Sequence, residues 1–370
     1  MIPIDKRLSS KESLEYALKV KSCMDKCNWD ELIQSLIVLN KDIELNNQAL
    51  YKNLEKNNKN WKIKNGQDYI AISWLTLDYN ILQKIKDYVD NKYIKPIIQD
   101  CSVLETYKCA KIKSYCDLVR RRKHKYSNNV NKKNIKNILN KKYTYESIYM
   151  MFEKCKYAYE QFSNKGINSW IIDKTEMNVC PYCNLAYTYN RGKKVTAQLD
   201  HFFSKSEYPM FALCYYNLIP SCPACNHIKT DNNENMTSPY EDNAFNNMKI
   251  KWKLAIDKNM KEENVKALTS DIEIFIDSDV TEDQKNISIM KLNEAYNKHK
   301  DYASEVIKKI QTYLNEDSKY LIQTIAFNNK ISSDEIEHFY LGTYVDKNKK
   351  IDRILEKMIR DFVEQYKNEV

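Results

Sequence analysis

Glycine and proline are scarce in this sequence, with 4 glycines and 7 prolines among 370 residues. Sandwiches and barrels built from many short strands need both residues at their tight turns, so this composition disfavours an all-β fold. Lys, Glu, Leu, Ile and Asn are used heavily instead. Such a composition favours helices, and we expect a mainly α-helical protein.

Long hydrophobic runs are also missing. No stretch approaches 18 consecutive apolar residues, so the sequence predicts no membrane-spanning helix. The first seven residues, Met1-Ile-Pro-Ile-Asp-Lys-Arg7, contain no apolar signal core, and we expect a cytoplasmic protein. In a reducing cytosol the 11 cysteines are expected to be thiols or metal ligands rather than disulfides.

Positive charge exceeds negative charge only moderately, with 59 basic and 50 acidic residues and a formal net charge of +9. The excess is concentrated in a basic segment, residues 120–142, which has ten Lys or Arg residues and no Asp or Glu. This segment is either the solvated face of a loop or helix, or a surface that follows nucleic-acid phosphates. The candidate phosphate contacts in it are Arg120, Arg121, Arg122, Lys123 and Lys125.

Hydrophobic periodicity predicts helices along most of the chain. Ser9 to Glu12 has the pattern of a helix start. One long amphipathic helix is expected after Glu282. Other helices are predicted at about 67–92, 98–122, 147–163, 316–328, 333–341 and 348–368. Residues 249–256 and 272–276 alternate with period two, which predicts one β-hairpin.

Two Cys-x2-Cys pairs stand out, Cys180 with Cys183 and Cys222 with Cys225, with 38 residues between the pairs. Each pair can present two thiolates to one tetrahedral zinc ion. Four sulfurs fill every position of such an ion, so the sequence predicts a structural zinc and places any catalytic ion elsewhere. The remaining cysteines are predicted to be small buried hydrophobic residues: Cys23, Cys27, Cys101, Cys109, Cys116, Cys155 and Cys214.

The segment between and just after the two pairs holds an ordered set of polar residues. Asp200-His201 is followed by Asn217 sixteen residues after the histidine, and by Asn226 nine residues later. This order and spacing closely resembles the HNH nuclease signature in its zinc-knuckle form. The resemblance implies a ββα-metal (His-Me finger) module, with strands at Asp200-His201 and at about 217–220 and a helix starting near residue 225.

The resemblance also implies a role for each residue. His201 would be the general base, oriented by Asn217, because a near-neutral imidazole can take a proton from water. Asp200 and Asn226 would bind one Mg²⁺ or Mn²⁺ ion, for which oxygen ligands are preferred. Some HNH relatives have histidine at the last position, which leaves His227 as the alternative ligand. Lys205 and Lys229 are candidate phosphate contacts, although exposed lysines beside a basic helix are more often unspecific.

Two further segments, residues 204–209 and 238–242, are similar to segments of Septu-type and retron-associated bacterial anti-phage HNH proteins. That similarity implies a DNA substrate and a separately encoded ATPase partner of the ABC or SMC-like kind. The expected organisation is a helical region at 1–165, a nuclease module with structural zinc at 166–256, and short strands followed by helices at 257–370. The alternatives are a non-catalytic, zinc-stabilised nucleic-acid-binding or interaction subunit, and a nuclease that cleaves RNA.

Overall fold

The computed structural model describes residues 1–61, 68–94, 152, 154–192, 194–230, 235–254, 272–346 and 349–369. Helices predominate among these residues, together with two two-stranded sheets, which confirms the mainly helical α+β fold expected from composition. The chain forms two compact units: unit 1 is Met1–Arg7, Asn168–Phe202 and Ile219–Val370, and unit 2 is Leu8–Ile167 and Phe203–Leu218. These limits differ from the predicted domain boundaries, because residues 203–218, which were expected in the nuclease module, belong to unit 2.

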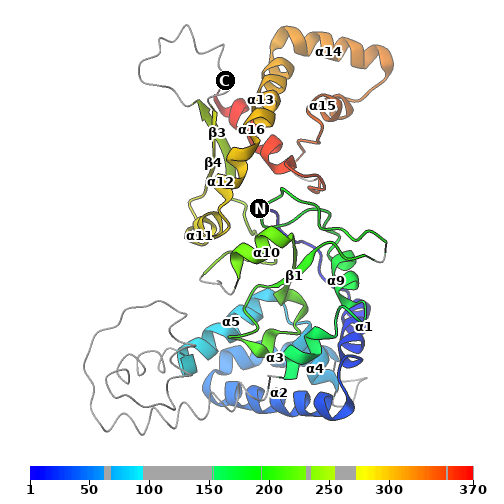
Figure 1. Ribbon diagram of the computed structural model, residues 1–370, viewed down its shortest axis with the longest axis vertical. Coiled ribbons are helices and arrows are strands. Elements are labelled where there is room, and N and C mark those ends of the chain that lie inside the picture. Colours follow the sequence, from blue (N-terminus) through cyan, green and yellow to red (C-terminus); the bar gives the residue numbers. More distant parts are fainter. Residues whose placement is uncertain are drawn as a thin grey trace, which may run out of the picture. The chain divides into compact units, whose positions relative to one another are not determined.

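The described part of unit 2 is helical (Figure 1). Its elements are α1 (Ser10–Lys21), α2 (Lys26–Asn46), α3 (Gln48–Trp61), α4 (Asp68–Leu75), α5 (Tyr79–Val89), the π-helix η1 (Asp90–Ile94), and the 3-10 turns η3 (Pro209–Phe211) and η4 (Tyr215–Asn217). The predicted start of α1 is confirmed, because Ser9 and Glu12 form a reciprocal capping box. The single helix predicted at 67–92 is wrong: α4 ends at Leu75, and Asp78 caps a new helix, α5.

Residues 203–218, which connect β1 to β2, are held inside unit 2. The Trp74 indole N–H donates to the carbonyl oxygen of Met210 at 2.8 Å, and its ring stacks on Phe211 with centroids 6.3 Å apart. Phe203 stacks on Tyr79 with centroids 5.8 Å apart. The helices of unit 2 therefore fix the connection between the two strands by aromatic packing and a buried hydrogen bond.

Unit 1 contains both sheets. Its elements are α9 (Ile167–Thr175), β1 (Gln198–His201), β2 (Leu218–Ser221), α10 (Pro223–Lys229), β3 (Lys249–Leu254), β4 (Ile272–Asp277), α11 (Thr281–Ile289), α12 (Leu292–Tyr296), the 3-10 turn η6 (Asn297–His299), α13 (Lys300–Leu314), α14 (Glu316–Asn329), α15 (Ser333–Leu341) and α16 (Glu356–Glu369). The long helix predicted after Glu282 is interrupted: α11 ends at Ile289, and Lys291 takes a left-handed conformation with φ of 52°. The helix predicted from 348 begins at Glu356, whose side chain accepts bonds from the N–H groups of Asp352 and Arg353.

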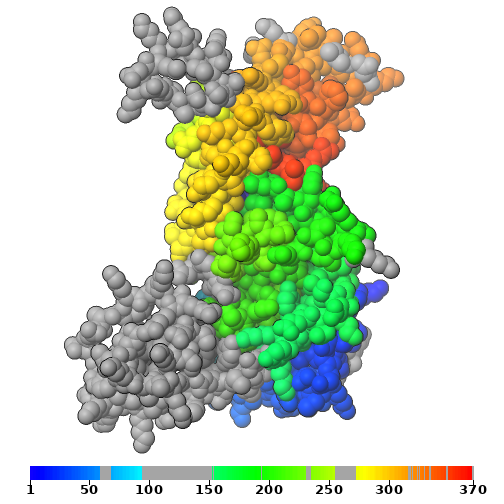
Figure 2. Space-filling model, in the orientation of Figure 1, coloured from blue at the N-terminus to red at the C-terminus, as the bar shows by residue number. Residues whose placement is uncertain are grey.

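The predicted β-hairpin is confirmed, with β3 and β4 antiparallel and Lys249 opposite Asp277. Helix side chains cap the outer edges of both strands. On β3, Asp361 of α16 accepts from the N–H of Ile250 at 2.8 Å. On β4, Asn293 of α12 accepts from the N–H of Ile276 at 2.9 Å. These bonds satisfy edge groups that would otherwise be open to pairing with another strand. Figure 2 shows the yellow and orange side chains of α11, α12 and α13 forming one continuous surface beside this hairpin.

Among the cysteines outside the two pairs, Cys155 and Cys214 are buried as predicted. The prediction is wrong for Cys27, which is exposed, and Cys23 is half-buried. Three cysteines lie outside the described residues, Cys101, Cys109 and Cys116. The helix predicted at 98–122 and the basic segment 120–142 also lie outside them, with its candidate contacts Arg120, Arg121, Arg122, Lys123 and Lys125. Of the helix predicted at 147–163, residues 154–160 are helical, whereas 147–151 and 153 are outside the described residues. No helix within the described ranges is long and apolar enough to cross a membrane.

Candidate functional site

The four paired cysteines form one buried cluster in unit 1. Their Sγ atoms all lie within 4.8 Å of one another, and those of Cys183 and Cys222 are 3.9 Å apart. A tetrahedral zinc site with Zn–S bonds of about 2.3 Å needs sulfurs about 3.8 Å apart. The separations are far longer than a disulfide bond, which is about 2.05 Å. The cluster can therefore hold a metal ion such as zinc.

Local backbone structure forms this cluster. In the first knuckle the N–H of Cys180 bonds the carbonyl oxygen of Ala186 at 2.8 Å, and Asn184 turns the chain in a left-handed conformation with φ of 55°. The second knuckle begins α10, with Cys222 at its N-cap. Main-chain N–H groups point at the sulfurs. One of them is the N–H of Cys222, whose nitrogen lies 3.4 Å from the Sγ of Cys180. Hydrogen bonds from the other thiols lower the pKa of Cys222, whereas the same bonds raise the pKa of Cys183 and of Cys225, so they stabilise one thiolate within the cluster.

The strands β1 and β2 form a sheet, and α10 follows β2 directly and packs against β1 (Figure 1). Two residues of α10, three positions apart, point at two residues of β1, two positions apart. Asn226 donates through Nδ2 to Oε1 of Gln198 at 2.7 Å, and Lys229 donates through Nζ to the carboxylate of Asp200. This match arises because i and i+3 share a helix face, whereas i and i+2 share a strand face.

Asp200 is buried, with 3% of its surface exposed. The hydroxyl of Tyr182 donates to Oδ2 at 2.6 Å, and Nζ of Lys229 lies 3.1 Å from Oδ1 and 3.0 Å from Oδ2. Lys229 also donates to the carbonyl oxygen of His201 at 3.0 Å. Burial, together with the charge of Asp200, raises the pKa of Tyr182 well above 10, so its hydroxyl remains a donor.

Lys229 was predicted to be an exposed phosphate contact, and here the prediction is wrong. Its exposed fraction is 0%, and its ammonium faces Asp200 and lies 5.7 Å from the centre of the Phe202 ring. Lys205, the other predicted lysine, is half-buried, with its ammonium 4.8 Å from the centre of the Tyr159 ring. The charge of Lys229 is therefore used inside the protein, where it balances a carboxylate.

The other predicted site residues are placed as follows. His201 ends β1 and is half-buried. Asn217 is fully buried in unit 2, and its amide bonds main-chain groups of the connecting segment: the N–H of Phe203 at 2.7 Å, and the carbonyl oxygens of Phe203 and Phe211 at 3.1 Å each. His227 is exposed on α10, whereas its neighbour Asn226 faces β1.

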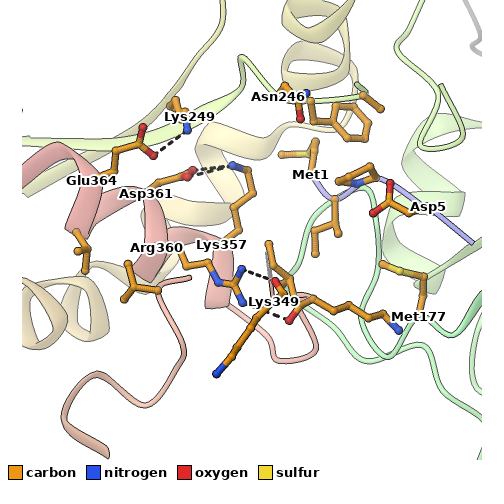
Figure 3. A pocket seen from close by; sticks show the side chains of 18 of the residues that line it. Met1, Asp5, Met177, Asn246, Lys249, Lys349, Lys357, Arg360, Asp361 and Glu364 are labelled. Carbon is orange, nitrogen blue, oxygen red and sulfur yellow. Dashed lines mark hydrogen bonds and ion pairs between the residues drawn. The ribbon is translucent and has the colours of Figure 1, made fainter. Parts of the chain in front are cut away.

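Unit 1 also has a cavity of about 1000 Å³ that contains none of the predicted site residues. It lies between the first residues of the chain, residue 345, residues 349–351 and α16 (Figure 3). Some of the charged groups that line it form ion pairs: Lys357 pairs with Asp361 at 2.8 Å, and Lys249 pairs with Glu364 at 2.9 Å. Because the cavity contains none of the predicted site residues, the cluster around Asp200 is the stronger candidate for the predicted chemistry.

Two functional candidates escaped the sequence analysis, Tyr182 as a contact of Asp200 and Lys229 as its counter-ion. Lys229 could have been found from helical spacing, because it lies three residues after Asn226 on the same face of α10. Tyr182 lies inside the first knuckle, and no pattern in the sequence pointed to its contact with Asp200. Comparison of the chain with protein-family models, curated proteins and solved structures found no match.

Proposed function

We propose that this chain is a metal-dependent endonuclease of the HNH type that hydrolyses phosphodiester bonds of nucleic acid, with DNA as the expected substrate. The observation that carries the proposal is the arrangement of β1, β2 and α10. Asp200 and His201 lie on the first strand, Asn226 faces that strand from the helix, and a four-cysteine cluster holds the helix start. This arrangement is the one that the HNH resemblance implies.

The donor atoms suit a hard divalent cation. Asp200 offers carboxylate oxygens, and Asn226 has its Nδ2 committed to Gln198, which leaves Oδ1 as the ligand atom. Mg²⁺ and Mn²⁺ prefer such oxygen ligands. When bound there, either ion would supply a Lewis acid for a phosphate oxygen and the leaving 3′ oxygen. Asn226 is favoured over His227 because only Asn226 faces β1.

The chain's own residues would perform the remaining steps. His201 would accept a proton from the attacking water, and hydrolysis would leave a 5′ phosphate. Asn217 would act through the backbone that follows His201, because its amide fixes both main-chain groups of Phe203. The zinc ion, on Cys180, Cys183, Cys222 and Cys225, would be structural, since all four of its positions are filled by sulfur.

One observation favours a second candidate, a non-catalytic subunit that binds nucleic acid or another protein. Asp200 is already neutralised by Lys229, and a buried ion pair of this kind can serve structure alone. A module without catalysis would not need His201 or Asn226. The nuclease candidate therefore predicts that substitution of His201 or Asn226 abolishes cleavage and leaves folding intact. The non-catalytic candidate predicts no cleavage for these substitutions to change.

The deciding experiment is cleavage of plasmid DNA, single-stranded DNA and RNA by the purified chain with Mg²⁺, Mn²⁺ or EDTA. We expect cutting that requires a divalent ion and is lost in His201→Ala, with rates at least 100-fold lower, because general-base catalysis contributes about 10² to 10⁴. His299→Ala is the matched control, since this half-buried histidine of η6 is not a candidate site residue and the variant should retain full activity. Equal cleavage by wild type and His201→Ala would remove His201 from the mechanism. Nucleic-acid binding without cleavage would favour the second candidate, and cutting of RNA alone would change the substrate.

We further propose a role in bacterial anti-phage defence with an ABC or SMC-like ATPase partner. Its support is the similarity of residues 204–209 and 238–242 to Septu-type and retron-associated HNH proteins. An ATPase co-purified with the tagged chain from a host that carries the neighbouring genes is the expected result. The absence of any ATPase among the proteins that co-purify with the tagged chain would contradict this part of the proposal.

A further inference from the structure

Lys229 and Asp200 form a closed pair that solvent does not reach. Lys229 is 0% exposed and Asp200 is 3% exposed, and the ammonium lies within 3.1 Å of both carboxylate oxygens. Its third contact, with the carbonyl oxygen of His201, lies on the same strand. The three donors of the ammonium are therefore accounted for by one carboxylate and one carbonyl group.

A divalent ion on Asp200 needs the oxygens that Lys229 already bonds. Mg²⁺ binds its ligand oxygens at about 2.0 to 2.1 Å, well inside the contact distances of the ammonium. Two cations at such short range in a low-dielectric environment repel each other strongly. Binding of the divalent ion must therefore weaken or break the contact between Lys229 and at least one oxygen of Asp200.

We propose that Lys229 is the resident counter-ion of Asp200 and that a divalent cation displaces it on binding, while Tyr182 keeps the carboxylate in place. This inference rests on the proposed nuclease function. Tyr182 suits the holding role because it lies between Cys180 and Cys183, so the metal cluster fixes its backbone. Its hydroxyl bonds Oδ2 at 2.6 Å and carries no charge that would repel a cation. Such outer contacts orient ligands and change metal affinity by about 10- to 100-fold.

The first test measures Mn²⁺ binding by the electron paramagnetic resonance signal of free Mn²⁺, with the zinc-loaded full chain. Lys229→Met and Lys229→Gln remove the competing charge, and we expect both variants to bind Mn²⁺ at least tenfold more tightly than the wild type. Lys357→Met is the matched control, because the ammonium of Lys357 forms another buried pair, with Asp361 at 2.8 Å, and not with Asp200. Its Mn²⁺ affinity should equal that of the wild type.

A second measurement uses stability. Removing Lys229 leaves the charge of Asp200 buried without its cation, so Lys229→Met should melt at a lower temperature than the wild type. If a divalent ion takes the place of the ammonium, saturating Mn²⁺ should restore most of that loss. The loss caused by Lys357→Met should remain. A loss in Lys229→Met that Mn²⁺ does not reduce would overturn the proposal.

Tyr182→Phe tests the holding role. We expect Mn²⁺ affinity to fall about tenfold while zinc content stays at one ion per chain. Tyr296→Phe is the matched control, because this buried tyrosine donates to the carbonyl oxygen of Cys183 at 2.7 Å, next to the same cluster. It should retain the affinity of the wild type. An equal effect of both substitutions would assign Tyr182 a structural role only.

The outcomes separate this inference from the proposed function. Normal Mn²⁺ binding and cleavage by the wild type, with unchanged or weaker affinity in both Lys229 variants, would overturn the displacement and leave the nuclease intact. A wild type that neither binds Mn²⁺ nor cleaves nucleic acid would contradict both. Tighter binding in the Lys229 variants, reversed stability loss and the specific effect of Tyr182→Phe would together support the proposal.

Discussion

Replacement of Asn217 by alanine should open the segment that connects β1 to β2. Its amide accepts from the N–H of Phe203 and donates to the carbonyl oxygens of Phe203 and Phe211, all in a fully buried position. Phe211 retains a bond from the N–H of Cys214, so the cost falls mainly on the two groups of Phe203. Each buried polar group that loses its hydrogen bond costs about 1 to 3 kcal/mol, so the two groups of Phe203 give a total of roughly 2 to 6 kcal/mol.

The measurement is amide hydrogen exchange of the segment, followed in the wild type and Asn217→Ala. A loss of roughly 2 to 6 kcal/mol corresponds to exchange that is roughly 30-fold to 20,000-fold faster, since each 1.4 kcal/mol is about a factor of ten. We expect this acceleration at Phe203 and across residues 203–218. Because the segment follows directly on His201, cleavage should be lost as well.

Asn286→Ala is the matched control. Asn286 is also fully buried, and its amide bonds the N–H of Thr237 at 2.8 Å and the carbonyl oxygen of Thr237 at 3.0 Å. The local cost should therefore be similar, with faster exchange at Thr237, but cleavage should persist. An acceleration of exchange at Phe203 smaller than fivefold in Asn217→Ala would refute the reasoning. Equal loss of cleavage in Asn217→Ala and Asn286→Ala would also refute it.

Two other predictions concern the metal cluster and the start of α16. Cys222→Ser should lower zinc content from one ion per chain to near zero and lower the melting temperature by roughly 6 to 12 °C, as expected for a loss of about 3 kcal/mol, whereas Cys214→Ser, outside the cluster, should retain its zinc. Retained zinc in Cys222→Ser, measured by atomic absorption, would remove it from the ligand set. Although burial acts to raise the pKa of Glu356, bonds from Thr343, main-chain N–H groups and Arg360 bring it below the usual 4.5. Its contribution to stability is thus present above about pH 4.5 and lost as pH falls through the lowered pKa, so Glu356→Gln should flatten the acid side of the stability curve, followed by urea unfolding at pH 2.5 to 7.

Much of the secondary structure could be predicted because local patterns determine it. Alternating residues in β3 and β4 predicted the hairpin, and Ser9 with Glu12 predicted the start of α1. Interruptions were harder to predict. The break after α11 depends on a left-handed Lys291, a residue with no sequence preference for that conformation.

The assignment of residues 203–218 to unit 2 could not be predicted either. Their neighbours in sequence belong to the expected module, but their burial comes from helices more than 100 residues earlier, through Trp74 and Tyr79. Apolar residues such as Phe203 and Phe211 indicate only that a core exists. Which core they join depends on long-range packing, and a single sequence contains no record of it.

The charge pairing in the candidate site was also only partly predictable from the sequence. The resemblance to the HNH signature selected Asp200, His201 and Asn226 as candidates for metal binding and proton transfer, and these roles stay predictions. Lys229 was misread as an exposed phosphate contact, because lysine is almost never fully buried unless it is paired. The pairing itself was predictable in part: a carboxylate buried on β1 requires a cation, and helical spacing places Lys229 on the face of α10 that Asn226 already directs toward that strand. A buried acidic residue in a proposed metal site should therefore prompt a search for the cation that balances it when the metal is absent.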